Sequence, residues 1–159
     1  MEKETTPVHG TITPQDAAGA QGPVIVHASC AAVAGRGVLV LGPSGAGKSS
    51  LVLEMLSRGA GLVADDRVIL SRETDALIAA SPPPLEGLIE ARGIGILKAR
   101  YGGPTKVSMV VDLGKDELER LPPQRSTILL GVSLPLLHNT GTAAFAAAIL
   151  QYLREGRSA

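Results

Sequence analysis

One short stretch of the 159-residue sequence has the residue types and spacing of a phosphate-binding loop. It matches the pattern G-x-x-x-x-G-K-[ST] with Gly42, Pro43, Ser44, Gly45, Ala46, Gly47, Lys48 and Ser49. Glycines at these places let successive backbone N–H groups turn inward and bind phosphate oxygens. Lys48 is placed to reach the β- and γ-phosphates, and the Ser49 hydroxyl to coordinate Mg²⁺. The loop therefore predicts a site for a nucleoside triphosphate with Mg²⁺.

The segments on either side of this loop are those that a phosphate-binding loop needs. Residues 37–41 form an apolar run typical of a buried strand, and residues 50–56 are typical of a helix that ends at Gly59. The positive N-terminus of that helix would face the phosphates. A chance glycine-rich turn is the alternative, and the combination of strand, loop and helix argues against it.

Two adjacent carboxylates, Asp65 and Asp66, come directly after the apolar residues 61–64. A carboxylate at the end of such a strand resembles the one that holds the metal in many nucleotide-binding proteins. One of the two could hold the metal or its water, and the other could accept a proton. A solvated turn or a helix cap is the alternative interpretation.

Four further side chains could take part in the same chemistry. His27 ends a predicted strand at residues 24–27, and a structural or surface role is the alternative for it. Glu90 and Arg92 precede a glycine turn and suit metal binding and phosphate clamping, or equally a surface ion pair. Arg120 precedes a Pro-Pro turn and could reach a phosphate or remain solvated.

The composition excludes several classes of partner. The formal net charge is zero and charged residues make up 19%, which gives no electrostatic reason to expect a nucleic acid or a membrane surface. Two tyrosines and one phenylalanine are the whole aromatic set, so base-stacking platforms are not expected. The single cysteine, Cys30, fits a reducing compartment, and no apolar run has the length of a membrane span. We therefore expect a cytoplasmic protein.

The pattern along the chain predicts one α/β domain over residues 23–155, after a loose lead-in over residues 1–22. Strands alternate with helices but include an antiparallel hairpin, which favours a mixed β-sheet with flanking helices. The predicted elements beyond those already given are a hairpin of residues 68–70 and 77–80, strands at 107–113 and 127–132, one or two helical turns at 116–121, and a helix at 142–154.

Taken together and in this order, several segments resemble the catalytic domain of bacterial HPr kinase/phosphorylase. They are His27, the phosphate-binding loop, residues 62–66, residues 90–96 and residues 119–121. Residues 90–96 carry the family's E-x-R-G-x-G-I signature, which is far more specific than a phosphate-binding loop. The resemblance covers roughly residues 24–135 and implies a P-loop kinase domain of the HPr kinase/PEP carboxykinase-like fold class.

This resemblance implies the activity and its ligands. It implies ATP-dependent phosphorylation of a seryl residue of HPr, the histidine-containing phosphocarrier protein of the sugar phosphotransferase system. Lys48 would bind the β- and γ-phosphates of ATP, and Ser49 and Glu90 would hold Mg²⁺. A homo-oligomer, a hexamer in the family, is also implied.

The resemblance further implies which side chains would carry out the transfer. Asp66, or its neighbour Asp65, would be the general base that accepts the proton of the serine hydroxyl. His27 would support this acidic pair. Arg92 and Arg120 would stabilise the charge on the transferring phosphoryl group.

Two departures from the family pattern affect the expected activity. Long members carry an N-terminal domain, where this chain has about twenty residues, as in the shortened proteobacterial form. Residues 138–143, which correspond to a loop associated with the reverse phosphorylase reaction, contain no arginine or lysine. We therefore expect the kinase reaction rather than its reverse. A nucleotide-sensing regulator without turnover and a small-molecule kinase are the alternatives.

Overall fold

The computed structural model describes residues 10–159. Its elements are β1 (Thr11–Ile12), α1 (Pro14–Ala18), β2 (Val24–His27), β3 (Ser29–Val33), β4 (Arg36–Leu41), α2 (Lys48–Ser57), β5 (Gly61–Ala64), β6 (Arg67–Glu73), β7 (Ala76–Ala80), a 3-10 turn (Pro83–Leu85), β8 (Leu88–Ala91), β9 (Gly95–Lys98), β10 (Thr105–Asp116), β11 (Arg125–Leu129), β12 (Val132–Asn139) and α3 (Phe145–Glu155).

Ten strands within this part of the chain form one mixed sheet. Its order is β1-β2-β6-β7-β10-β4-β3-β5, and β12 and β11 extend it from β10. Strands β4, β10 and β12 run parallel to one another, whereas β3 pairs antiparallel with both β4 and β5. The predicted mixed sheet is confirmed. Strands β8 and β9 form a separate two-stranded hairpin.

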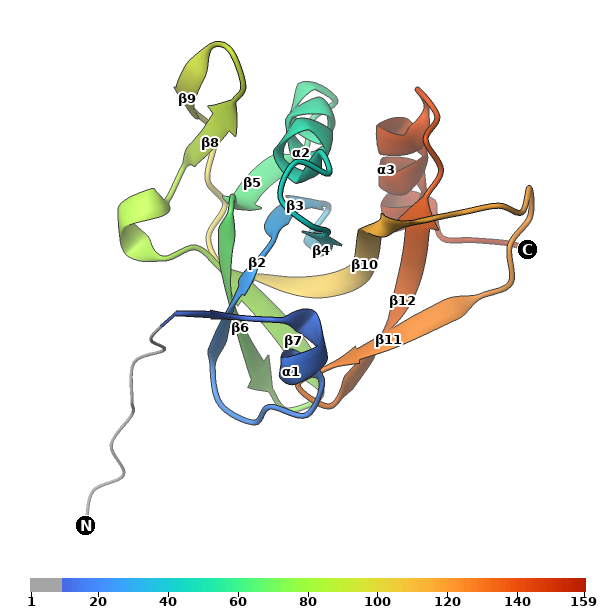
Figure 1. The fold of residues 1–159 in the computed structure, drawn as a ribbon, viewed down its shortest axis with the longest axis horizontal. Coiled ribbons are helices and arrows are strands. Elements are labelled where there is room, and N and C mark those ends of the chain that lie inside the picture. The colour runs from blue at the N-terminus through green and yellow to red at the C-terminus, as the bar shows by residue number, and fades with distance from the viewer. Residues whose placement is uncertain (1–9) are drawn as a thin grey trace.

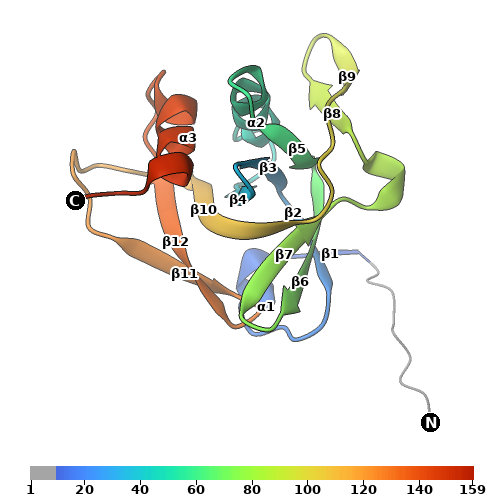
Figure 2. The same ribbon diagram turned by 180° about the vertical axis from the view of Figure 1, so that it is seen from behind.

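Two hydrophobic cores lie on opposite faces of the central strands. Helices α2 and α3 lie side by side over one face, and α1 lies on the other side (Figure 1). The buried side chains of β4 alternate accordingly: Val38 and Val40 pack toward the two helices, and Leu39 and Leu41 pack into the other core. The view from behind shows β2, β6 and β7 with β11 and β12 enclosing that second core (Figure 2).

The expected loose lead-in is wrong for its described part, residues 10–22; residues 1–9 lie outside the described range. Strand β1 pairs with β2, and α1 begins after Thr13, whose Oγ1 accepts a hydrogen bond from the Asp16 N–H at 3.1 Å. Ala17 of α1 is fully buried. Ile12 and Ala17 of this segment therefore pack on the second core.

The single strand expected at residues 127–132 is a hairpin. The chain reverses through Leu130 and Gly131, which have φ angles of 49° and 76°. Their N–H groups donate to the carbonyl oxygens of Ala17 and Ala18 at 2.9 and 3.2 Å. The reversal is therefore held by α1, a contact that the local sequence does not reveal.

The helical turns expected at residues 116–121 are also wrong, since β10 continues to Asp116 and an irregular segment follows. Glu117 accepts two hydrogen bonds from the Arg125 guanidinium, at 3.1 and 3.0 Å, and one from the Glu119 N–H at 3.3 Å. The hydrogen bonds from Arg125 hold the pKa of Glu117 below its usual range. A helix of so few residues has little stability of its own, and these contacts replace it.

The packing of α3 against the sheet gives a stability prediction. Ile149 on α3 is fully buried in the core under the two helices. We expect Ile149→Ala to lower the free energy of unfolding by about 2–5 kcal/mol, since it leaves a cavity. The measurement is urea denaturation followed by circular dichroism. The control is Gln151→Ala, on the exposed side of the same helix, which should change the free energy of unfolding by less than about 0.5 kcal/mol. Equal losses in the two variants would contradict this packing.

Candidate active site

The phosphate-binding loop joins β4 to α2, as its sequence predicts. Gly42 has a φ of 151°, and a Cβ added there would come within 3.2 Å of the Cβ atoms of Ala46 and Leu113. Gly47 precedes the helix with a φ of 101°, in the left-handed region. Both fixed glycines are thus required by the backbone itself. The free N–H groups of the first turn of α2 point to the loop.

Lys48 is almost completely buried at the start of α2. Its Nζ donates to the carbonyl oxygens of Gly42 and Pro43, at 2.8 and 3.1 Å, across the mouth of the loop. Burial lowers the pKa of Lys48, while the nearby carboxylates of Asp66 and Asp65 act in the opposite direction. The ammonium group is therefore a positive charge held against the loop, poorly solvated and available to an anion.

Asp65 is buried, with 6% of its surface exposed, and is held by three hydrogen bonds from separate elements. Its Oδ1 accepts from the Ser49 hydroxyl at 2.6 Å and from the Ser29 hydroxyl at 2.8 Å. Its Oδ2 accepts from the N–H of Glu90 at 3.0 Å. These bonds fix the orientation of the carboxylate and join the loop helix, β3 and β8 around it.

Asp66 faces a different environment from its neighbour. Its φ of 70° lies in the left-handed region, and its side chain is 61% exposed. Its Oδ1 lies 3.0 Å from Nε2 of His27, at the end of β2. Register explains this approach, since β2 and β6 pair antiparallel with His27 opposite Arg67. The two adjacent acids are therefore separated into a buried, fully bonded carboxylate and an accessible one paired with a histidine.

A cavity of about 170 Å³ lies between these groups and the loop. Its lining consists of His27, Ser29, Gly45, Gly47, Lys48, Ser49, Ser50, Asp66, Glu90 and Arg92. Of the charged side chains that the sequence analysis singled out, the cavity brings together His27, Lys48, Asp66, Glu90 and Arg92. Asp65 does not line it, but is hydrogen-bonded to Ser49, which does. Arg120 is exposed on the segment between β10 and β11 and does not line the cavity.

Ser29 is a site residue that the sequence analysis missed. It is fully buried, its hydroxyl donates to Asp65, and the N–H of Asp66 lies 3.4 Å from the same hydroxyl. It lies only two residues after His27, but residues 28–34 are mostly small and have no clear strand pattern, so Ser29 was not singled out. In the structure this stretch contains β3, between β4 and β5.

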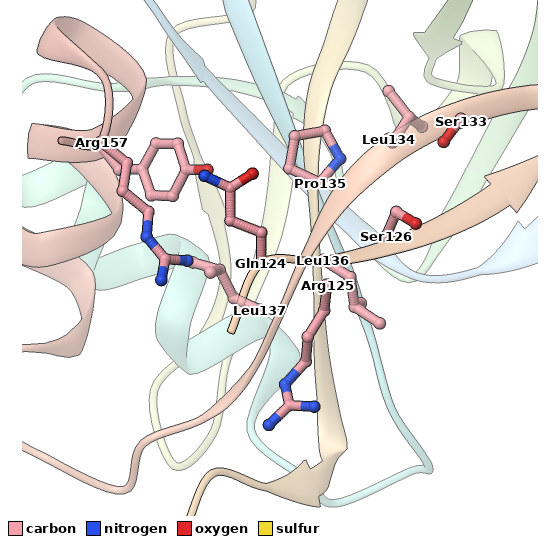
Figure 3. A pocket seen from close by; sticks show the side chains of 10 residues that line it. Gln124, Arg125, Ser126, Ser133, Leu134, Pro135, Leu136, Leu137 and Arg157 are labelled. Carbon is pink, nitrogen blue, oxygen red and sulfur yellow. The ribbon is translucent and has the colours of Figure 1, made fainter. Parts of the chain in front are cut away.

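A second hollow, of about 340 Å³, lies away from the loop (Figure 3). Its labelled side chains come from Gln124 just before β11, from β11 and β12, and from the C-terminal tail, with Arg125 and Arg157 as its charged groups. Arg125 is bound to Glu117, and Arg157 donates to the carbonyl oxygens of Pro122 and Ala159. Both guanidinium groups already donate hydrogen bonds within the chain, so this hollow is a weaker candidate for binding an anion than the cavity at the loop.

Comparison with known proteins finds one family over most of the chain. Residues 21–137, most of the chain, match the family described as the HPr Serine kinase C-terminal domain. The chain belongs to this family. Among residues 10–159, no helix is long and apolar enough to cross a membrane.

Curated relatives and a solved structure are also named as HPr kinases. The HPr kinase/phosphorylase of Bordetella petrii is 44% identical over 64% of this chain, and that of Azoarcus sp. is 40% identical over 70%. The chain spans 37% and 40% of the length of these two relatives. The HPr(Ser) kinase/phosphatase structure from Coxiella burnetii matches with a TM-score of 0.72 and 29% identity, covering 82% of this chain and 93% of that one.

The hydrogen bonds to Asp65 make a testable prediction about the stability of this domain. We expect Ser29→Ala to lower the free energy of unfolding by about 1–3 kcal/mol, because a buried carboxylate loses one of its donors. Chemical denaturation measures this loss. Ser126→Ala removes an exposed hydroxyl from β11 and should change stability by less than about 0.5 kcal/mol. A Ser29→Ala protein as stable as the wild type would show that Ser29 does not support Asp65.

Proposed function

We propose that the chain transfers the γ-phosphoryl group of ATP to the seryl hydroxyl of an HPr-type phosphocarrier protein. The observation that carries this proposal is the His27–Asp66 pair, with 3.0 Å between Nε2 and Oδ1, at a cavity that also contains Lys48. A phosphate-binding loop alone supports only nucleotide binding. An accessible carboxylate next to it supplies what a hydroxyl acceptor needs, a group to accept its proton.

The loop would hold the triphosphate through backbone N–H groups and the charge of Lys48. Gly45 and Gly47 line the cavity without side chains, so the phosphate oxygens can approach the backbone closely. Lys48 would exchange its bonds to the Gly42 and Pro43 carbonyl oxygens for bonds to phosphate. An anion is a better partner for an ammonium group than a neutral carbonyl, which favours this exchange.

The residues around Asp65 fit Mg²⁺. Ser49 and Glu90, which line the cavity, supply a hydroxyl and a carboxylate oxygen, ligands that this ion prefers. No cluster of three or more acidic, histidine or cysteine side chains able to hold a metal occurs among residues 10–159. This fits an ion held by one or two carboxylates together with substrate phosphates. When bound, Mg²⁺ neutralises charge on the phosphate oxygens.

Asp66 is the residue we assign as general base. It is the accessible acid of the pair, whereas the oxygens of Asp65 already accept three hydrogen bonds. His27 would orient the Asp66 carboxylate and stabilise its charge. The serine proton would pass to Asp66 while the serine oxygen attacks the γ-phosphorus and the bond to the leaving ADP oxygen breaks.

Arg92 and Arg120 differ in what supports their proposed roles. Arg92 lines the cavity, where its guanidinium could stabilise charge on the transferring group. Arg120 lies outside this cavity, so within a single chain nothing in the geometry supports a part in transfer. For the reverse reaction, residues 138–143 contribute no lysine or arginine, so we propose that transfer to HPr predominates.

Asp66→Asn tests the base assignment. We expect the rate of phosphate transfer from labelled ATP to HPr to fall by about 10²–10⁴-fold, because the amide cannot accept the serine proton. The dissociation constant for Mg²⁺-ATP should change little, since Asp66 is not placed to bind phosphate. Asp75→Asn, on an exposed carboxylate of the β6–β7 turn, is the matched control and should leave transfer unchanged.

The same assay separates the proposed function from its alternatives. Transfer by Asp66→Asn at the wild-type rate would refute the base assignment. Tight ATP binding by the wild-type chain without transfer would favour a nucleotide sensor. Label recovered on a small metabolite instead of HPr would favour a small-molecule kinase. Each of the last two results would overturn the proposed function.

A further inference from the structure

We propose that Ile94 and Ile96, at the free end of the β8–β9 hairpin, form an apolar contact for the acceptor protein. The inference rests on the proposed function and adds to it the surface on which the acceptor docks. Both side chains are largely exposed, 79% for Ile94 and 63% for Ile96, which is unusual for isoleucine in a small domain.

The two faces of the hairpin differ in their surroundings. Ile89 of β8 is buried and its cross-strand partner Leu97 packs against the core under α2 and α3. Glu90 and Ile96 form the next cross-strand pair and therefore share the opposite face. The stability of the hairpin is supplied by the Ile89–Leu97 face. Ile96 contributes little to that packing, and with Ile94 it leaves two exposed apolar side chains within three residues at the end of the hairpin.

This apolar surface is continuous with the cavity. Glu90, directly opposite Ile96, lines the cavity, as does Arg92, which lies two residues before Ile94. A serine that reaches Asp66 must bring its neighbouring residues past the same edge. The two isoleucines are thus placed to contact the part of the acceptor next to its phosphorylated serine.

The position of the exposed Asp66 carboxylate at the cavity places the acceptor next to the hairpin. Glu90 and Arg92 of the hairpin segment line the same cavity as Asp66, so an acceptor serine that reaches Asp66 approaches beside them. The exposed charges of Arg92 and Lys98 on the hairpin would surround the isoleucines, as a polar rim surrounds the apolar centre of a protein interface.

Other exposed apolar side chains do not share this position. Leu118 and Leu121 lie on the segment between β10 and β11, and Ile128 lies on β11. Both ribbon views place that segment on the opposite side of the molecule from the β8–β9 hairpin (Figures 1 and 2). Ile128 lies on β11 and does not line the cavity at the loop, so it provides a control of the same residue type.

The test is steady-state transfer to purified HPr by the Ile94→Ser/Ile96→Ser double variant. We expect the KM for HPr to rise about tenfold, equivalent to about 1.4 kcal/mol. The kcat at saturating HPr and the dissociation constant for Mg²⁺-ATP should stay within about twofold, because neither isoleucine is placed to contact the nucleotide. Ile128→Ser should leave all three quantities unchanged. Folding of each variant is checked by thermal denaturation.

The outcomes distinguish this inference from the function on which it rests. Transfer by the wild type with an unchanged KM for HPr in the double variant would overturn the docking surface alone. A loss of kcat or of nucleotide affinity without a rise in KM would overturn it too, because the hairpin would then act by positioning Arg92. Failure of the wild-type chain to phosphorylate HPr would overturn the proposed function and the inference together.

Discussion

The rest of the site depends on the hydrogen bonds to the buried carboxylate of Asp65. Hydroxyl groups from β3 and from the first turn of α2, and a backbone N–H from β8, all donate to it. A carboxylate out of contact with water is tolerated only when such donors satisfy it. These hydrogen bonds therefore set where the phosphate-binding loop lies relative to the hairpin that carries Glu90 and Arg92.

The topology of the sheet explains why these groups can meet. Strands β4 and β5 both run antiparallel to β3, so they are parallel to each other and end at the same edge. The phosphate-binding loop follows β4, and Asp65 follows β5, which brings both to that edge. Open α/β sheets bind ligands at the carboxyl ends of parallel strands. Strand β2 then reaches Asp66 from the other part of the sheet, through its pairing with β6.

The parts of the fold that the sequence predicted are those with strong local patterns. The apolar strands on both sides of α2, the β6–β7 hairpin and the C-terminal helix appear where expected. Strand β3 was missed because Ser29, Cys30 and Ala31 have no strong strand preference, and burial between β4 and β5 holds them in place. The reversal at Leu130 and the course of residues 116–121 were missed because α1 and Arg125, respectively, decide them.

The sequence by itself determined the phosphate-binding loop and the family signature, because both depend on residues adjacent in the chain and on backbone shapes that glycine permits. It also singled out His27, Asp65, Asp66, Glu90 and Arg92, though not which of the two aspartates would be buried. Only the tertiary structure buried Asp65, exposed Asp66 beside His27, left Arg120 outside the cavity and turned Ile94 and Ile96 outward. The pairing of strands that are distant in the sequence decides which side chains are buried and which groups they bond to. The local sequence pattern does not predict that pairing.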